Sequence, residues 1–202
     1  MNRKLFLPAI GVAAAITLAG CAGNENPAAS GSATASSQQS APSNAGSQVS
    51  AEHNDADTMF AQMMIPHHKQ AVQMSELMLA KDGIDNKITD LATTIKEAQG
   101  PEIQTMTGWL KTWGEPTASD MGGHGMEGMM TDEQLKELES AQGTDASRMF
   151  LESMTEHHKG AVGMAEDEIA DGKNPQAIAL AKQIEKTQQA EIKKMQDLLA
   201  GL

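Results

Sequence analysis

The chain has 202 residues and a formal net charge of −12, with 27 acidic and 15 basic side chains. So acidic a composition argues against nucleic acid as a partner and against electrostatic binding to anionic lipid. The single cysteine, Cys21, excludes an intramolecular disulfide and leaves no further thiolate for a metal site or for catalysis.

Residues 1–20 have the pattern of a secretory signal peptide. Arg3 and Lys4 precede an apolar run over residues 5–18, which at about 14 residues is too short for a membrane span of roughly 20. Leu-Ala-Gly then leads into Cys21 and resembles a bacterial lipobox, whose cysteine carries lipid and becomes the first residue. We therefore predict an exported lipoprotein, anchored in the membrane through Cys21 and facing the periplasm or the cell exterior. The alternative is an ordinary signal peptide before an incidental cysteine.

Residues 21–52 are rich in Ser, Ala, Gly, Asn, Gln and Pro and have almost no large side chain to bury. Such a segment does not compensate its ordering entropy, so we predict a flexible linker that holds the folded part away from the membrane. Residues 53–202 remain, and about 150 residues are enough for one domain with a hydrophobic core.

Residues 53–202 contain an internal repeat. Phe60, Met64, His67, His68 and Met74 recur in the same order as Phe150, Met154, His157, His158 and Met164. After one residue of slippage, Gln99, Glu102 and Met106 recur as Gln188, Glu191 and Met195. These identities in register indicate a duplication, with repeat one at 55–115, repeat two at 145–202, and a Met/Gly/His linker with a short helix at 116–144.

Each repeat has apolar residues at three- and four-residue spacings on both sides of an Asp-Gly pair, which predicts a helical hairpin. We expect helices at about 56–81 and 85–112 in repeat one, and at about 145–170 and 175–200 in repeat two. Thr131, with Gln134 three residues later, predicts the start of a short additional helix. Because each hairpin must bury one apolar stripe, the expected fold is all-α, an antiparallel four-helix bundle of two duplicated hairpins.

The repeated His and Met residues predict a site for a soft metal ion. In the first helix, Met64, His67 and Met74 share one face, and two adjacent imidazoles bring four ring nitrogens that need partners. Thioether sulfur selects Cu(I) and imidazole also serves copper, so a copper ion, preferably Cu(I), is the expected cofactor. The candidate ligands are Met64, His67, His68, Met74, Met106, Met154, His157, His158, Met164 and Met195. The residues expected to orient a histidine or to bind the ion directly are Gln99, Glu102, Gln188 and Glu191.

Simpler interpretations of the same residues stay open. Methionine at helical spacing is usual core filling, and a buried histidine is often a hydrogen-bonded core residue without metal. The glycine-rich segment 121–130 adds weaker candidate ligands, which are His124, Met126, Met129 and Met130. That segment is otherwise a flexible linker whose methionines are adventitious or scavenge oxidants.

The two His-His-x-x-Ala-x-x-Met segments, each followed by Gln-x-x-Glu-Ile-x-x-Met, resemble the bacterial family known as domain of unknown function 305 over residues 55–202. The resemblance implies a ferritin-like four-helix bundle in an exported protein, and periplasmic copper binding as described for some members. It places the family's ligands at Met64, His67, His68 and Met74, and at Met154, His157, His158 and Met164. Repeat two lacks counterparts of Pro66, Met63 and Met78 and has Ser147 where repeat one has Asp57, so the repeats need not bind metal equally.

Three functions remain open. The one we predict is copper binding, buffering or tolerance by a lipoprotein, without enzymatic turnover. The second is an interaction module or structural module of the cell envelope that holds no metal. The third is a ferritin-like redox enzyme, whose di-metal sites use Glu-x-x-His on two helices. No Glu lies three residues before any of the four repeated histidines, which argues against the enzyme.

Overall fold

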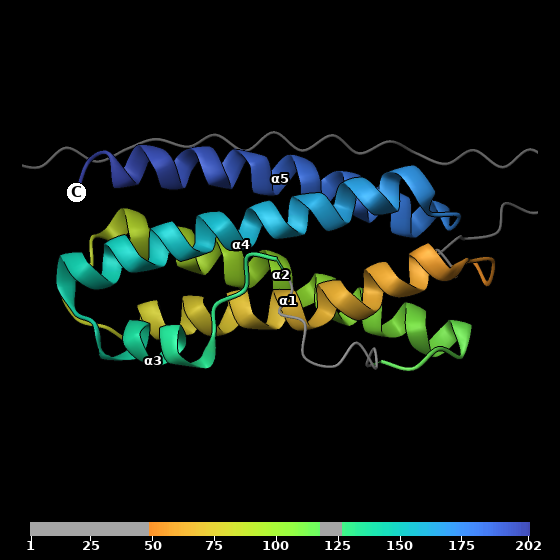
Figure 1. Ribbon diagram of the computed structural model, residues 1–202, viewed down its shortest axis with the longest axis horizontal. Coiled ribbons are helices and arrows are strands. Elements are labelled where there is room, and N and C mark those ends of the chain that lie inside the picture. Colours follow the sequence, from red (N-terminus) through yellow and green to blue (C-terminus); the bar gives the residue numbers. More distant parts are fainter. Residues whose placement is uncertain (1–48, 118–126) are drawn as a thin grey trace, which may run out of the picture. The chain divides into compact units, whose positions relative to one another are not determined.

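The computed structural model describes residues 49–117 and 127–202. This part folds into five helices (Figure 1), which are α1 (Asp55–Leu79), α2 (Asn86–Trp113), α3 (Asp132–Ser140), α4 (Gly143–Asp171) and α5 (Pro175–Leu199). The described residues contain no strand, which confirms the predicted all-α class for them, and none of their helices is apolar over the length that a membrane span requires. The predicted signal peptide, Cys21, His124 and Met126 lie outside the described residues.

The limits of the four long helices lie within two residues of the predicted ones. Local side-chain caps account for several of these limits. Asn54 and Asp57 form a capping box at the start of α1, and Thr131 and Gln134 form the predicted capping box at the start of α3. The side chain of Asn174 accepts two backbone hydrogen bonds at the start of α5. Helix positions were therefore readable from short stretches of sequence.

The long helices pair as two hairpins, α1 with α2 and α4 with α5, and the hairpins meet mainly through α1 and α4. Figure 1 shows α4 lying between α5 and α1, with the short α3 beside α1. Helices α1 and α4 run antiparallel, because Asp57 near the start of α1 bonds the backbone of Asn174 just beyond α4, while His67 meets His157 further along. We call the contact between α1 and α4 the central seam.

Two apolar clusters lie along the central seam, one on each side of the histidines. The Phe150 cluster contains Phe150 of α4 and, from α1, Met74, which comes after its histidines. The Phe60 cluster contains Phe60 of α1 and, from α4, Ala161, which comes after its histidines. Each cluster thus draws on both hairpins, and the two clusters hold the seam together from both ends.

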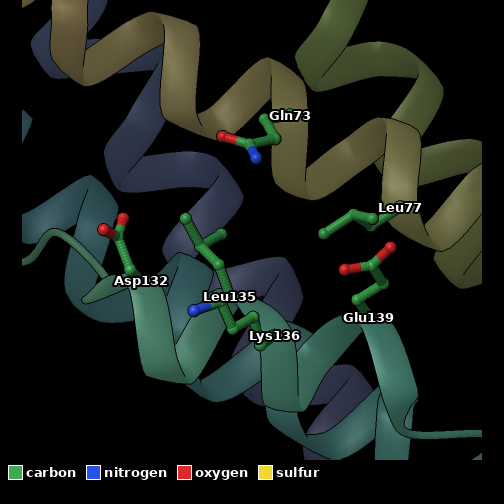
Figure 2. A pocket seen from close by; sticks show the side chains of 6 residues that line it. All are labelled: Gln73, Leu77, Asp132, Leu135, Lys136 and Glu139. Carbon is green, nitrogen blue, oxygen red and sulfur yellow. The ribbon is translucent and has the colours of Figure 1, made fainter.

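Helix α3 covers α1 next to the Phe150 cluster. Leu77 of α1 and Leu135 of α3 are partly buried and pack against that cluster. A hollow of about 320 Å³ lies between the two helices. Figure 2 shows both leucines pointing into it, with Asp132 and Glu139 of α3 at its edges. No His, Met or Cys lines this hollow, so it does not offer the ligands that a soft ion prefers.

Candidate metal centre

The four repeated histidines meet in the middle of the central seam, and all four are fully buried. The ring centroids of His67 on α1 and His157 on α4 are 3.7 Å apart, and the ring planes are inclined by 37°. Consecutive residues of a helix point about 100° apart, so the next residues, His68 and His158, point instead toward α2 and α5. Both histidines of each pair are buried, because α1 packs against both α2 and α4, and α4 packs against both α1 and α5.

Carboxylates of the outer helices contact the two outer histidines. His68 donates from Nε2 to Glu102 Oε2 on α2 at 2.8 Å, and His158 donates from Nε2 to Glu191 Oε2 on α5 at 2.7 Å. A proton on Nε2 leaves the lone pair of a neutral ring on Nδ1, and both Nδ1 atoms are buried without a partner. A carboxylate in this position fixes the orientation of an imidazole and makes it a more basic ligand.

Burial favours the neutral form of the inner histidines. It lowers the pKa of His67 from 6.5 to about 3, with a smaller contribution from the neighbouring His68. Burial, followed by the nearby His67, also lowers the pKa of His157. The pKa of His68 is lowered by burial against the opposing effect of Glu102. Because a metal binds the neutral ring, these three histidines have no proton to lose at neutral pH before they bind an ion.

Several nitrogens of these histidines have no hydrogen-bond partner. Neither Nδ1 nor Nε2 of His157 has one, and Nδ1 of His67 also lacks one. Buried polar atoms are nearly always paired, and an unpaired one costs about 1–3 kcal/mol. Free imidazole nitrogens on two touching rings are donor atoms that copper accepts, so the residues present fit a soft ion.

Nitrogen and oxygen donors alone do not complete a metal site here. Among residues 49–117 and 127–202, no three His, Cys, Asp or Glu side chains are placed so that they would hold a metal ion. Any ligand beyond two imidazoles would have to come from another residue type, and the thioether sulfurs of methionine are the candidates. Their softness favours Cu(I) over harder ions.

The candidate methionines form two groups, and each group combines the two hairpins. The first group belongs to the Phe60 cluster and consists of Met64, Met106 and Met164. The second group belongs to the Phe150 cluster and consists of Met74, Met154 and Met195. Met164 is half-buried and the other five are fully buried. Each group combines both hairpins because α1 and α4 are antiparallel. Residues before the histidines of one helix therefore lie beside residues after the histidines of the other.

The two candidate glutamines are also inside the protein. Gln99 of α2 and Gln188 of α5 are buried. Neither amide atom of Gln99 has a hydrogen-bond partner, and neither does Oε1 of Gln188. The predicted polar residues of α2 and α5 are therefore all turned into the protein, but only the glutamates bond the histidines.

The end of the linker packs over the histidines, which the sequence did not reveal. The backbone carbonyl of Glu127 accepts a long hydrogen bond from His67 Nε2, at 3.4 Å. Gly160 leaves room for this contact, because a Cβ there would collide with the Glu127 carbonyl. Gln70, which stands in repeat one where Gly160 stands in repeat two, bonds both backbone groups of Met130, at 2.8 and 2.9 Å. In the sequence, the signal for this contact was the difference between the repeats at this position, where one has Gln and the other has Gly.

The two weaker candidate ligands among the described residues, Met129 and Met130, are consecutive and differ in burial. Met130 is buried in the Phe150 cluster. Met129 is half-buried in a hollow that it shares with Glu152 and Glu156 of α4. Met130 alone of this pair therefore joins the thioethers of the second group.

The sequence model of a family described as Domain of unknown function (DUF305) matches residues 57–199, which is most of the chain. This chain belongs to the DUF305 family. The family resemblance read from the paired His-His and Met motifs is thus confirmed. No curated protein matches the chain.

Two solved DUF305 structures and the solved structures of CopM share this architecture. The chain is 38% identical to a Streptomyces coelicolor protein named as a secreted DUF305 protein, with a TM-score of 0.68 over 72% of this chain and 91% of that one. It is 29% identical to a DUF305 fragment from Deinococcus radiodurans, with a TM-score of 0.67 over 74% and 98% of the chains. It is 33% identical to CopM in the Cu(II)-bound form, with a TM-score of 0.64 over 72% and 96% of the chains. CopM is also solved in Cu(I)-bound and Ag-bound forms.

Proposed function

We propose that the protein binds copper at the central seam and serves in copper buffering or copper tolerance, without catalytic turnover. The observation that carries the proposal is the His67–His157 ring pair, in which His157 has two buried nitrogens without partners. An ion bound there would occupy the one His157 nitrogen that carries a lone pair in the neutral ring. Imidazoles come from α1 and α4, and thioethers come from the two methionine groups, so both hairpins would hold the ion.

Copper is the preferred ion on the chemistry of these donors. Zinc and harder ions rarely use thioether sulfur, whereas Cu(I) favours it. The similarity to CopM supports the same choice, because that relative is solved with Cu(I), Cu(II) and silver. The outer histidines, held by Glu102 and Glu191, would offer Nδ1 as the coordinating atom.

The same proposal includes the compartment and the origin of the fold. Residues 1–20 act as a signal peptide, Cys21 carries lipid, and the domain is exported and anchored through that lipid. A relative that is named as a secreted protein supports the export. The two hairpins are duplicated halves of a ferritin-like antiparallel four-helix bundle, which agrees with their matched histidine–glutamate pairs.

A metal-free structural role is the second candidate, and one observation favours it. The His68–Glu102 and His158–Glu191 pairs are buried hydrogen bonds that already satisfy part of the site without an ion. In that role copper would leave the unfolding temperature unchanged. The copper-binding role predicts that Cu(I) raises it, because an ion that binds only the folded state stabilises that state.

Copper counting in variants tests the proposal. The purified protein, loaded with Cu(I) and desalted, is compared with a variant that has alanine at His67, His68, His157 and His158. We expect the variant to lose most of its copper while His53→Ala, which changes a histidine outside the central seam, keeps the full amount. A second variant, Met64→Leu with Met154→Leu, retains side-chain volume and should weaken Cu(I) binding with unchanged helix content. Unchanged copper in both variants would contradict the proposal and assign binding to the linker.

A further inference from the structure

A second hollow lies at the end of the central seam that is remote from α3. It has a volume of about 550 Å³ and lies between the first turns of α1 and the last turns of α4. Three methionines line it, Met59 and Met63 from α1 and Met164 from α4. Four carboxylates line it as well, those of Asp55, Asp167, Glu168 and Asp171. We call it the acidic Met hollow.

The methionines of the acidic Met hollow are more exposed than packing alone would leave them. Met59 is 49% exposed, and Met63 and Met164 are half-buried. Repeat two does not reproduce the set, because Ser153 replaces Met63 and the counterpart of Met164 is the fully buried Met74. The fold therefore does not require three thioethers at this place.

Glu168 supplies an independent sign that this hollow takes a cation. Its side chain is 1% exposed and lines the hollow, and neither carboxylate oxygen has a hydrogen-bond partner. The neighbouring Asp57 accepts the backbone N–H groups of Asn54, Lys173 and Asn174, so those donors do not serve Glu168. A buried carboxylate without a donor is costly, and a positive ion beside it removes that cost.

We propose that the acidic Met hollow is a second metal site, which binds a soft monovalent cation, Cu(I) or Ag(I), through Met59, Met63 and Met164. The ion would replace the proton that the buried Glu168 side chain otherwise retains, so that its carboxylate balances the charge of the ion from the buried side. The carboxylates among the described residues do not form a set that would hold a metal by themselves, so the thioethers are necessary ligands. Hard divalent ions take six or more oxygens and gain nothing from sulfur, which selects against them.

The surrounding charge also favours a cation. Asp55, Asp167 and Asp171 lie at the exposed rim of the hollow, and no basic side chain lines it. Acidic groups around a concave site raise the local concentration of positive ions. This site contains none of the four seam histidines and shares only Met164 with the methionine groups of the seam, so Met59, Met63 and Glu168 carry it independently of the function proposed above.

Silver titration followed through isotope-labelled methionine methyl groups tests the second site. Ag(I) is the probe because it is diamagnetic and has the same preference for thioethers as Cu(I). In the purified protein we expect the methyl signals of Met59, Met63 and Met164 to shift together. The variant Met59→Leu with Met63→Leu should bind less Ag(I) by about one equivalent, since two of three thioether ligands are gone.

Two control variants show whether the Ag(I) signal comes from the acidic Met hollow. Met149→Leu, at the position in repeat two that matches Met59, lies outside the hollow and should bind as much Ag(I) as the unchanged protein. Glu168→Gln retains the volume of the side chain but not its charge, and should weaken the shift of Met164. Methyl signals of Met59 and Met63 that stay fixed while Ag(I) binds elsewhere would overturn the second site. If no metal binds at the seam histidines while the methyl signals of Met59 and Met63 still shift, only the proposed histidine centre would be overturned.

Discussion

The two ends of the central seam are built from matching residues of the two repeats. One end is fully buried, and the other has a hollow that is open to solvent. At the end near α3, Met74 and Met78 are fully buried in the Phe150 cluster. At the other end, Met164 lines the acidic Met hollow together with Glu168. Met78 and Glu168 occupy matching positions in the repeats. The exchange of Met78 for Glu168, together with that of Met63 for Ser153, separates an apolar core from a candidate cation site.

Placing a carboxylate at the buried end should change the stability of the protein most. Met78→Glu puts a charge into the Phe150 cluster, where Met78 is fully buried. We expect the free energy of unfolding at neutral pH to fall by about 3–5 kcal/mol, because the charge has no partner. Urea denaturation measures this, and Met78→Leu should cost less than about 1.5 kcal/mol. A loss below about 1 kcal/mol for Met78→Glu would show that this end is also open to water.

Removing the carboxylate at the open end should have an effect that depends on pH. Burial, together with the adjacent Asp57, raises the pKa of Glu168 from 4.5 to about 8. Between these values the unfolded chain has lost the proton that the folded chain retains, so this group's contribution to stability falls as pH rises. Below pH 4.5 the contribution is fully present. Glu168→Gln does not titrate, so its stability relative to the unchanged protein should grow from acidic pH to pH 8.

Denaturation of the metal-free protein at several pH values across that window measures the difference. Asp55→Asn, which changes an exposed carboxyl group of the same hollow, serves as the matched control. A Glu168→Gln effect that is constant across the window would show that the buried carboxyl group titrates normally.

The middle of the seam predicts two small effects of opposite sign. A Cβ at Gly160 would collide with the backbone carbonyl of Glu127, so Gly160→Ala should lower the free energy of unfolding by about 1–3 kcal/mol. A Cβ at Gly163, one turn further along α4, would meet no atom within 4 Å. Gly163→Ala should therefore raise the free energy of unfolding by about 0.5–1 kcal/mol through helix propensity. Equal effects in thermal unfolding would mean that the linker does not pack on α4 in solution.

The sequence predicted the helices well because the relevant signals are local. Three- and four-residue apolar spacing and the caps at Thr131 and Asn174 act within one or two turns. It did not predict which helices meet at the centre. Which helices meet at the centre depends on how whole helix faces are buried. In the structure α1 and α4 form the seam, and α2 and α5 make few contacts with each other.

The sequence singled out the histidines and glutamates that meet at the seam, but not how the candidate methionines group around them. The sequence named Glu102 among the residues expected to orient a histidine or to bind the ion, and the structure joins Glu102 to His68. The sorting of methionines into two groups follows from the antiparallel crossing of the repeats, which no local pattern encodes. The contact of Glu127 with His67 spans 60 residues and comes from a segment without helical periodicity.

X-ray absorption at the copper edge, on the purified protein loaded with Cu(I), tests most directly whether imidazole and thioether bind the same ion. Together, the buried His67–His157 pair and the thioethers on both sides of it predict nitrogen and sulfur scatterers around copper. The nitrogen contribution should disappear in the variant with alanine at all four seam histidines. A spectrum with sulfur neighbours alone, unchanged in that variant, would contradict the seam as the copper centre.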